Sequence, residues 1–210
     1  MLNGLHLILY RAVSSFFNIG FYAVVPFLAI YLRDNLQLSG SIIGLIIGLR
    51  TFSQQGLFLI SGALADRYGG RIVILCGCII RIFGYLLLAF GESLWPVVLG
   101  ACLTGIGGAL FLPAIQALLA TAGTESESDG KRSRAEWFAV FAICGELGAV
   151  LGPVLGSLLA GFGFQQVTLA GAGVFVISLI ILFFRLPPPR VVILKCILLL
   201  DGKPSVSPAL

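Results

Sequence analysis

The sequence predicts an all-helical integral membrane protein with six transmembrane helices. Of its 210 residues, 59% are hydrophobic and 10% are charged, whereas soluble domains carry about 25% charged residues. Six mostly apolar stretches are each long enough to cross a bilayer. Lysine and arginine gather in alternate connecting segments, as expected of a chain that crosses a membrane repeatedly.

The six spans follow one another with short connectors. A helix rises about 1.5 Å per residue, so about 20 apolar residues cross the hydrocarbon core. Backbone amides inside a bilayer must be hydrogen-bonded within their own segment, so each stretch is expected to be a helix. The predicted spans lie near residues 5–32, 41–64, 72–91, 95–122, 136–162 and 166–185.

The basic residues predict the orientation of the chain. With a cytoplasmic N-terminus, the inside segments are 65–71, 123–135 and the tail from residue 185. They hold nine of the 13 lysines and arginines, against one, Arg33, in the outside segments. The nine are Arg67, Arg71, Lys131, Arg132, Arg134, Arg185, Arg190, Lys195 and Lys203. Positive charge favours the cytoplasmic side, so we expect a multi-pass protein of the cell (inner or plasma) membrane with its N-terminus inside.

Two pairs of spans share features that suggest an internal repeat. Spans one and four each contain a late proline, Pro26 and Pro113, which frees a carbonyl and bends a helix. Spans two and five each carry glycines at four-residue spacing, which allow helix backbones to approach closely. These glycines are Gly40, Gly44, Gly48, Gly148, Gly152 and Gly156. Spans one to three and four to six are therefore candidates for an inverted pair, a pattern typical of transporters.

Polar side chains near the middle of the spans are candidates for the functional site. Arg50, Arg81 and Glu146 each lie about ten residues into a span, and charges near the bilayer centre are costly and usually functional. Gln54 follows Arg50 by four residues and shares its helix face. Asn18 either faces a cavity or bonds across helices.

Glu146 is expected to carry a proton or to face the substrate. The alternative is a static pair between Glu146 and an arginine that holds helices together. For Arg50 a cavity-lining role is favoured over a purely structural one, whereas Arg81 fits either role. Arg11 lies close enough to the inner surface for its side chain to reach it.

The stretch "GALADRYGGR", residues 62–71, lies in the predicted cytoplasmic turn between spans two and three. It resembles the signature of the major facilitator superfamily. The matching residues are Gly62, Asp66, Arg67, Gly69 and Arg71. Gly62 would allow close helix packing, and Gly69 and Gly70 would allow a sharp turn with positive φ. Asp66 would be favoured beside a helix N-terminus.

This resemblance implies a latch. In the family, the aspartate and the arginines hold two halves of a transporter together on the cytoplasmic side and release during the transport cycle. The alternative is that Arg67 and Arg71 only anchor the topology.

A second stretch, "GAVLGPVLGS", residues 148–157, is similar to the antiporter motif of drug:proton antiporters in the same superfamily. The matching residues are Gly148, Gly152, Pro153 and Gly156, and Ser157 replaces a final glycine. The resemblance implies antiport, and the alternative is plain helix packing.

An arginine that drug:proton antiporters usually carry in span four is Ala101 here. The stretches "GLRTFSQQG", "RIFGY" and "TGIGGALFLPA" resemble the MdtH-type multidrug transporters, a subgroup that also lacks this arginine. The resemblance covers residues 1 to about 188.

Residues 1–186 are therefore expected to form the N-terminal six-helix half of a twelve-helix fold, as a 3+3 inverted repeat. Residues 187–210 resemble no seventh span, because the apolar run 191–200 is too short to cross a bilayer. We expect an atypical tail produced by truncation or a frame shift. The alternative is a genuine half-transporter that pairs with itself or with another half.

The predicted function is proton-coupled efflux of small amphipathic compounds, with the proton gradient as energy source and no cofactor. An uptake permease and a non-transporting remnant or assembly partner are the alternatives. An intramembrane serine protease would need a Ser–His pair, and the one histidine, His6, lies near the N-terminus. No residue cluster predicts a metal site or a nucleic-acid partner. Membrane lipid, a small-molecule substrate and a second half are the expected partners.

Overall fold

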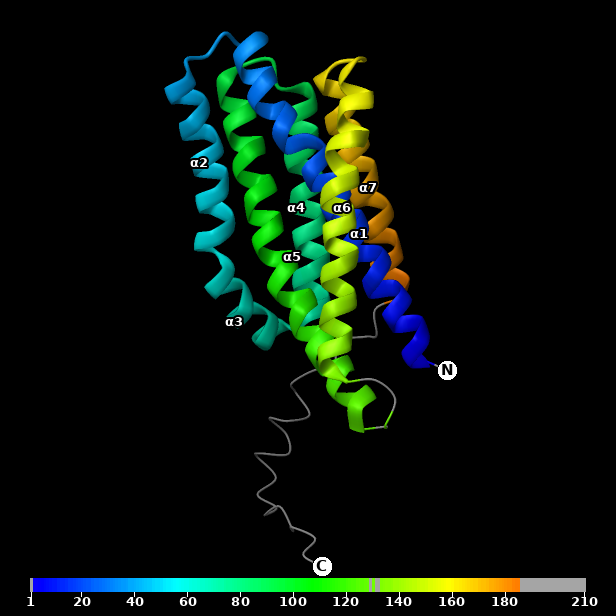
Figure 1. Ribbon diagram of the computed structural model, residues 1–210. Coiled ribbons are helices and arrows are strands. Elements are labelled where there is room, and N and C mark those ends of the chain that lie inside the picture. The colour runs from blue at the N-terminus through cyan, green and yellow to red at the C-terminus, as the bar shows by residue number, and fades with distance from the viewer. Residues whose placement is uncertain (1, 129, 131–132, 186–210) are drawn as a thin grey trace, which may run out of the picture.

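The computed structural model describes residues 2–128, 130 and 133–185, and every regular element in these ranges is helical. The elements form one upright bundle (Figure 1). They are α1 (Leu2–Asp34), α2 (Gly40–Gly56), α3 (Phe58–Tyr68), α4 (Gly70–Phe90), α5 (Leu94–Ser128), α6 (Arg134–Ala160) and α7 (Phe164–Arg185). The atypical tail expected at residues 187–210 lies outside the described part of the chain.

Six membrane spans are confirmed within the described residues. Their boundaries agree with the predicted ones to within a few residues, and in the first span the part of α1 whose side chains are described, Ser15–Asp34, lies at its C-terminal end. The second span, Gly40–Ala65, consists of two helices, α2 and α3, where an unbroken helix was expected. Leu57 forms the turn between them with φ −90° and ψ −3°. It follows Gly56, and glycine weakens a helix because its backbone loses more conformational freedom on ordering.

The proline residues do not end their helices. Pro26, Pro113 and Pro153 all lie inside long helices, α1, α5 and α6. In a membrane, neighbouring helices can satisfy the backbone groups that proline leaves free.

The packing of the spans agrees with an inverted repeat. In such a repeat α1 corresponds to α5, the pair α2 and α3 corresponds to α6, and α4 corresponds to α7. Under this correspondence the contact between α1 and α6 is equivalent to the contact between α5 and α2. In the same way the α4–α5 contact becomes the α7–α1 contact, and the α4–α7 contact maps onto itself. Each of these five contacts is extensive. The two triplets therefore use equivalent neighbours, although they run in opposite directions through the bundle.

Glycines bring α4 and α5 into direct backbone contact. A Cβ added at Gly77 would lie 2.9 Å from the Gly107 oxygen, and one at Gly107 would lie 2.6 Å from the Gly77 oxygen. Gly84 and Gly100 meet in the same reciprocal way, at 3.0 Å and 2.9 Å. Such approaches suit membrane helices, whose association depends on close packing of small residues.

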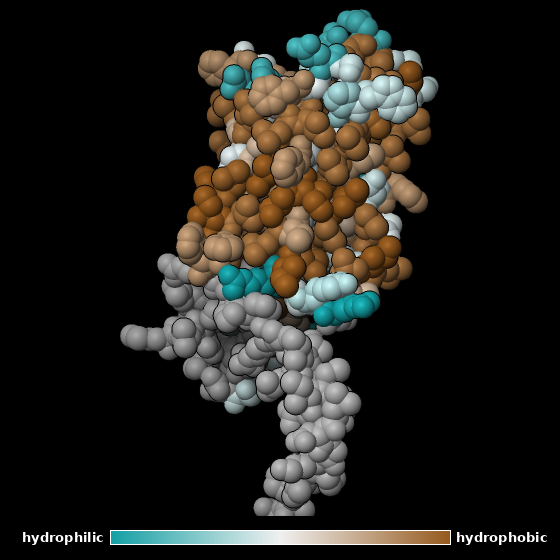
Figure 2. Space-filling view, turned by 180° about the vertical axis from the view of Figure 1, so that it is seen from behind, coloured by the Kyte–Doolittle hydropathy of each residue, from teal (hydrophilic) through white to brown (hydrophobic). Residues whose placement is uncertain are grey.

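The core of the bundle lies between α1, α4, α5 and α7. In an apolar stretch of 18 residues in each of the spans that these helices form, 33 to 56% of the residues are buried, against 11% in such a stretch of the span of α2 and α3 and 11% in that of α6. Large apolar side chains are exposed on these two outer spans, among them Leu45, Phe52 and Leu59 on one and Val150 and Leu158 on the other. Figure 2 shows a broad apolar band on the opposite side of the molecule, with polar side chains near its two ends. The whole circumference is thus suited to an apolar environment.

Candidate functional site

The turn between α3 and α4 carries the signature residues. Gly69 adopts φ 87°, which confirms the expected positive φ, and its amide donates to the Ala65 oxygen at 3.0 Å. Gly70 begins α4 instead of sharing the positive φ, and an added Cβ there would lie 3.2 Å from Leu118. The two glycines therefore have different roles: Gly69 reverses the chain, and Gly70 allows α4 to start close against α5.

One expectation about this turn is not met inside the chain. A Cβ added at Gly62 would meet nothing within 4 Å, so Gly62 allows no close packing among the described residues. Asp66 lies in the last turn of α3, four residues before α4 begins at Gly70. Its side chain lies outside the described part of the chain, so the favourable place beside a helix N-terminus stays a prediction.

Arg71 ties α4 to the end of α7. Its Nη2 donates a hydrogen bond of 2.7 Å to the Phe183 oxygen, and its guanidinium carbon lies 5.8 Å from the Phe183 ring centre. Cations are favoured beside the last carbonyls of a helix. Arg67 is exposed and lies over its neighbour Tyr68, at 5.5 Å. Within this half, Arg71 thus has a structural partner and Arg67 faces outward.

The antiporter-motif glycines form the contact between α6 and α1. Added Cβ atoms at Gly148 and Gly152 would lie 2.6 Å from the Ser15 oxygen and 2.7 Å from Tyr22 Cβ. Gly156 lies directly against the Ala23 oxygen. Pro153 lies between these glycines, inside the helix. In this chain the motif therefore performs helix packing, and the structure leaves its meaning for antiport as a prediction.

The two glycine stripes have different surroundings despite the same spacing. Added Cβ atoms at Gly40, Gly44 and Gly48 would meet nothing within 4 Å. The equivalent close approach between α2 and α5 is made by Gly105 of α5, which lies directly against the Arg50 backbone oxygen. The glycine stripe of α2 therefore faces away from the described helices.

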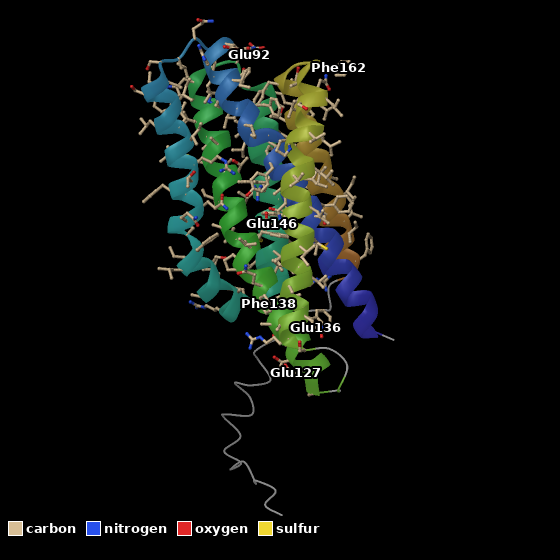
Figure 3. The ribbon with its side chains drawn as sticks, in the orientation of Figure 1. Glu92, Glu127, Glu136, Phe138, Glu146 and Phe162 are labelled. Carbon is tan, nitrogen blue, oxygen red and sulfur yellow. The ribbon has the colours of Figure 1, made fainter. Side chains whose placement is uncertain are left out.

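Glu146 faces away from the glycine contact. Each helical residue turns by about 100°, so Glu146 and Gly148 lie on nearly opposite sides of α6. Glu146 is exposed and lines a shallow, mostly apolar hollow of about 320 Å³. Its other lining residues are Ala142, Ile143, Leu147 and Val150. Figure 3 shows Glu146 near half the height of the bundle, between Glu92 and Phe162 at one end and Glu136 and Glu127 at the other.

Glu146 forms no static pair with Arg81 in this structure. All three side-chain nitrogens of Arg81 are buried without a hydrogen-bond partner, and so is Nη2 of Arg50. The carboxylate of Glu146 and these two guanidinium groups are therefore separate features of the bundle.

Arg81 is fully buried in a cage of three phenylalanine rings. Its guanidinium carbon lies 4.3 Å from the ring centre of Phe17, 5.0 Å from that of Phe21 and 4.8 Å from that of Phe175. A buried cation–π contact stabilises by about 0.5–2 kcal/mol. On membrane-insertion scales, an arginine at the centre of a helix costs about 2.5–3.5 kcal/mol. Three rings can thus offset most of that cost, but they accept no conventional hydrogen bond from the guanidinium.

Arg50 joins Arg81 at the same ring. Its guanidinium carbon lies 4.6 Å from the centre of Phe21, and only 4% of the residue is exposed. Gln54 completes the group, because a Cβ added at Gly108 would lie 3.1 Å from Arg81 Nη1 and 3.4 Å from Gln54 Cδ. We call Arg50, Gln54 and Arg81 the arginine cluster. Their approach is possible because Gly108 has no side chain.

The structure thus divides the five predicted candidates. Arg50, Gln54 and Arg81 come together, whereas Asn18 lies at the α1–α6 contact, with its Cβ 2.8 Å from a Cβ added at Gly148. Glu146 lies on the exposed side of α6. The sequence reading missed the phenylalanine cage, although Phe17 and Phe21 are four residues apart and so share one face of α1.

Six spanning helices, arranged as two groups of three that make equivalent contacts, define a multi-pass helical membrane protein. The comparison with known families agrees with this arrangement, since the model of the Major Facilitator Superfamily matches residues 12–195. The chain belongs to this superfamily.

Curated relatives share most of this chain. An uncharacterized MFS-type transporter of Mycobacterium tuberculosis is 41% identical over 173 residues, which is 82% of this chain and 40% of the relative. The multidrug resistance protein MdtH of Aeromonas salmonicida is 35% identical over 170 residues, which is 81% of this chain and 41% of that protein. The chain therefore spans about 40% of the length of these relatives.

A solved structure confirms the fold. The crystal structure of the human organic anion transporter MFSD10 matches with a TM-score of 0.66 and 22% identity, over 84% of this chain and 40% of that chain. At this identity the likeness concerns the fold alone.

Proposed function

We propose that this chain is the N-terminal half of a secondary active transporter that exports small amphipathic compounds from the cell in exchange for protons. Its similarity to proteins named for multidrug resistance supports efflux. The signature turn and the glycine motif of α6 support the same class. In this proposal the N-terminus is cytoplasmic, and the signature turn faces the cytoplasm.

The exposed carboxylate of Glu146 is the observation that carries the proposal. It lies near half the height of a membrane bundle, in an apolar hollow on a span of which few residues are buried (Figure 3). A carboxylate at this depth is costly in lipid, and such groups usually face a water-filled path or another helix. A second six-helix bundle, packed over α2 and α6, would place Glu146 on a central pathway.

A second half is also supported by the exposed face of α2. Gly40, Gly44 and Gly48 form a smooth stripe with open space around it, which suits close packing of a further helix. The partner is either a separate six-helix half or a second copy of this chain.

The test is a twelve-helix chimera. Residues 1–185 are joined to the second half of the mycobacterial relative and reconstituted in liposomes with an imposed proton gradient. We expect proton-driven movement of ethidium, and we expect Glu146→Gln to abolish it while the protein still folds. Glu92→Gln is the matched control, because Glu92 lies at the end of the bundle (Figure 3).

Two results would contradict the proposal. Unchanged transport by the Glu146→Gln chimera would remove the proton-carrying role of Glu146. Proton-driven accumulation of the probe in the direction of uptake would replace efflux by the permease alternative. The chain alone, examined for its mass in detergent, shows whether a second copy serves as the other half.

A further inference from the structure

We propose that the arginine cluster is a binding site for an organic anion, and that a carboxylate attached to an apolar or aromatic body is its ligand. The proposal goes beyond the proposed function and does not rest on it, because it concerns an anion site within this half, whichever compounds the whole transporter moves. It is distinct from the proton-carrying role given to Glu146.

The first observation that supports an anion site is a group of buried guanidinium donors without hydrogen-bond acceptors. Arg81 is fully buried, and Nε, Nη1 and Nη2 all lack a hydrogen-bond partner, as does Nη2 of Arg50. Buried polar groups in native proteins are almost always hydrogen-bonded, so several orphaned donors at one place call for an acceptor. A carboxylate offers two oxygens with the spacing of the guanidinium fork and binds it by two parallel hydrogen bonds.

The second observation is that two positively charged guanidinium groups lie close together. Both guanidinium groups lie over the Phe21 ring, at 4.6 Å and 5.0 Å from its centre. Two cations so close in an apolar region repel each other. One anion between them would be attracted by both and would remove this repulsion.

The chain's own described carboxylates do not fill this role. Glu146 faces the hollow on the exposed side of α6. The other acidic residues of the described helices lie near helix ends, and those at Glu127 and Glu136 are visible at one end of the bundle in Figure 3. The counter-charge must therefore come from outside the described residues, and a bound compound is the source that we propose.

The walls of the cluster suit an aromatic ligand. Phe17, Phe21 and Phe175 surround the Arg81 head group, and Phe17 stacks on Phe111 at 4.1 Å between ring centres. Small-molecule sites usually combine such apolar walls with a few polar groups that fix orientation. The amide of Gln54 is the additional polar group here.

Benzoate is the probe for the test. The 210-residue chain is placed in lipid nanodiscs, and retention of radiolabelled benzoate is measured with benzamide and benzylamine as competitors. We expect saturable binding that unlabelled benzoate displaces and the neutral and cationic analogues do not. Arg81→Gln and Arg50→Gln should each weaken binding by about tenfold or more, since each removes charge-assisted hydrogen bonds. Arg33→Gln, which removes an exposed arginine at the end of α1, should leave binding unchanged.

A nearly isosteric change provides a second test that does not depend on removing an arginine. Gln54→Glu places a carboxylate beside Arg81 without changing the size of the side chain. We expect it to raise the thermal stability of the chain and to abolish benzoate binding, because the site then holds its own anion. Gln116→Glu is the matched control, since Gln116 is exposed on α5, about two helical turns beyond Gly108.

Each of these measurements has a result that would overturn the proposal. Absence of benzoate binding to the wild-type chain, equal displacement by benzamide, or unchanged binding in both arginine variants would each overturn the proposal. Unchanged benzoate binding in Gln54→Glu would do the same. Because binding is measured on this chain without transport, benzoate binding can fail while the chimera still exports ethidium, and the two proposals are therefore tested separately.

Discussion

The guanidinium carbon of Arg81 lies 4.3 Å from the centre of the Phe17 ring, and Phe17 in turn stacks on Phe111. The first contact joins α4 to α1 and the second joins α1 to α5. Because α1 and α5 touch each other at few other places, this row of side chains is a main connection across the middle of the bundle.

Replacing Phe17 by leucine should loosen this connection. The change removes one of three cation–π contacts and a ring stack, each worth about 0.5–2 kcal/mol, while keeping an apolar side chain. We expect unfolding of the purified chain in mixed micelles at lower SDS fractions, with a loss of about 1–3 kcal/mol. Phe90→Leu, at a side chain that is 63% exposed, is the control. Equal stability of the Phe17 and Phe90 variants would contradict the proposed connection.

Gly152→Ala should separate α6 from α1. An added Cβ would lie 2.7 Å from Tyr22 Cβ and 3.0 Å from the Ala23 nitrogen, so the helices must move apart. Overpacking of this kind costs about 1–3 kcal/mol. Gly44→Ala is the matched control, because its Cβ meets nothing within 4 Å. Both variants are compared by unfolding of the isolated chain, where only Gly152→Ala should lower stability.

The same control becomes informative in the twelve-helix chimera. If the glycine stripe of α2 packs against the second half, Gly44→Ala should weaken the chimera although it leaves the isolated chain unharmed. Cross-linking yield between the halves would measure this effect. Full tolerance of the change in the chimera would exclude close packing at Gly44.

Arg71→Gln should release the end of α7. The variant loses the 2.7 Å hydrogen bond to the Phe183 oxygen and the favourable charge at the helix C-terminus. Since Arg71 is only half-buried, we expect a modest cost of about 0.5–1 kcal/mol. Hydrogen exchange in the last turn of α7 should become several-fold faster, and Arg67→Gln should not change it. Equal exchange rates in the two variants would show that the bond contributes nothing in the membrane.

Ser133→Ala should fray the start of α6. The Ser133 hydroxyl accepts a hydrogen bond of 3.3 Å from the Glu136 amide, which caps the first turn. Loss of such a cap costs about 1 kcal/mol. Faster hydrogen exchange of the first α6 amides is the expected result, and Ser133→Asp, which restores a cap, should reverse it. Slow exchange in Ser133→Ala would mean that other contacts hold this turn.

The sequence was sufficient for the spans, because apolar length and the need to satisfy backbone amides leave a helix as the only solution. It was not sufficient for the break at Leu57, since a glycine in a span can equally be tolerated within a helix. The positive φ of Gly69 followed from residue type, whereas the place of Asp66 depended on where α3 ends.

For the candidate site, too, the spacing of residues predicted some contacts and not others. Spacing established that Arg50 and Gln54 share a face, but not that the face meets Arg81 or Phe21. Likewise, Gly44 and Gly152 belong to stripes of identical spacing, and only one of them has a neighbour in this chain. Periodicity determines which residues of a helix lie together, and tertiary packing decides what they touch.

The arrangement of the arginine cluster also bears on how the chain is made. Ribosomes deliver Arg50 and Arg81 to the membrane before α5 and α7, which supply Gly105, Gly108 and Phe175 around them. At that stage, Phe17 and Phe21 of α1 are the described cage rings already synthesised. An arginine in a partly formed bundle disfavours release into lipid. The second and third spans are therefore expected to stay beside the insertion machinery until the fourth arrives, so that this half enters the bilayer as a group and not one helix at a time.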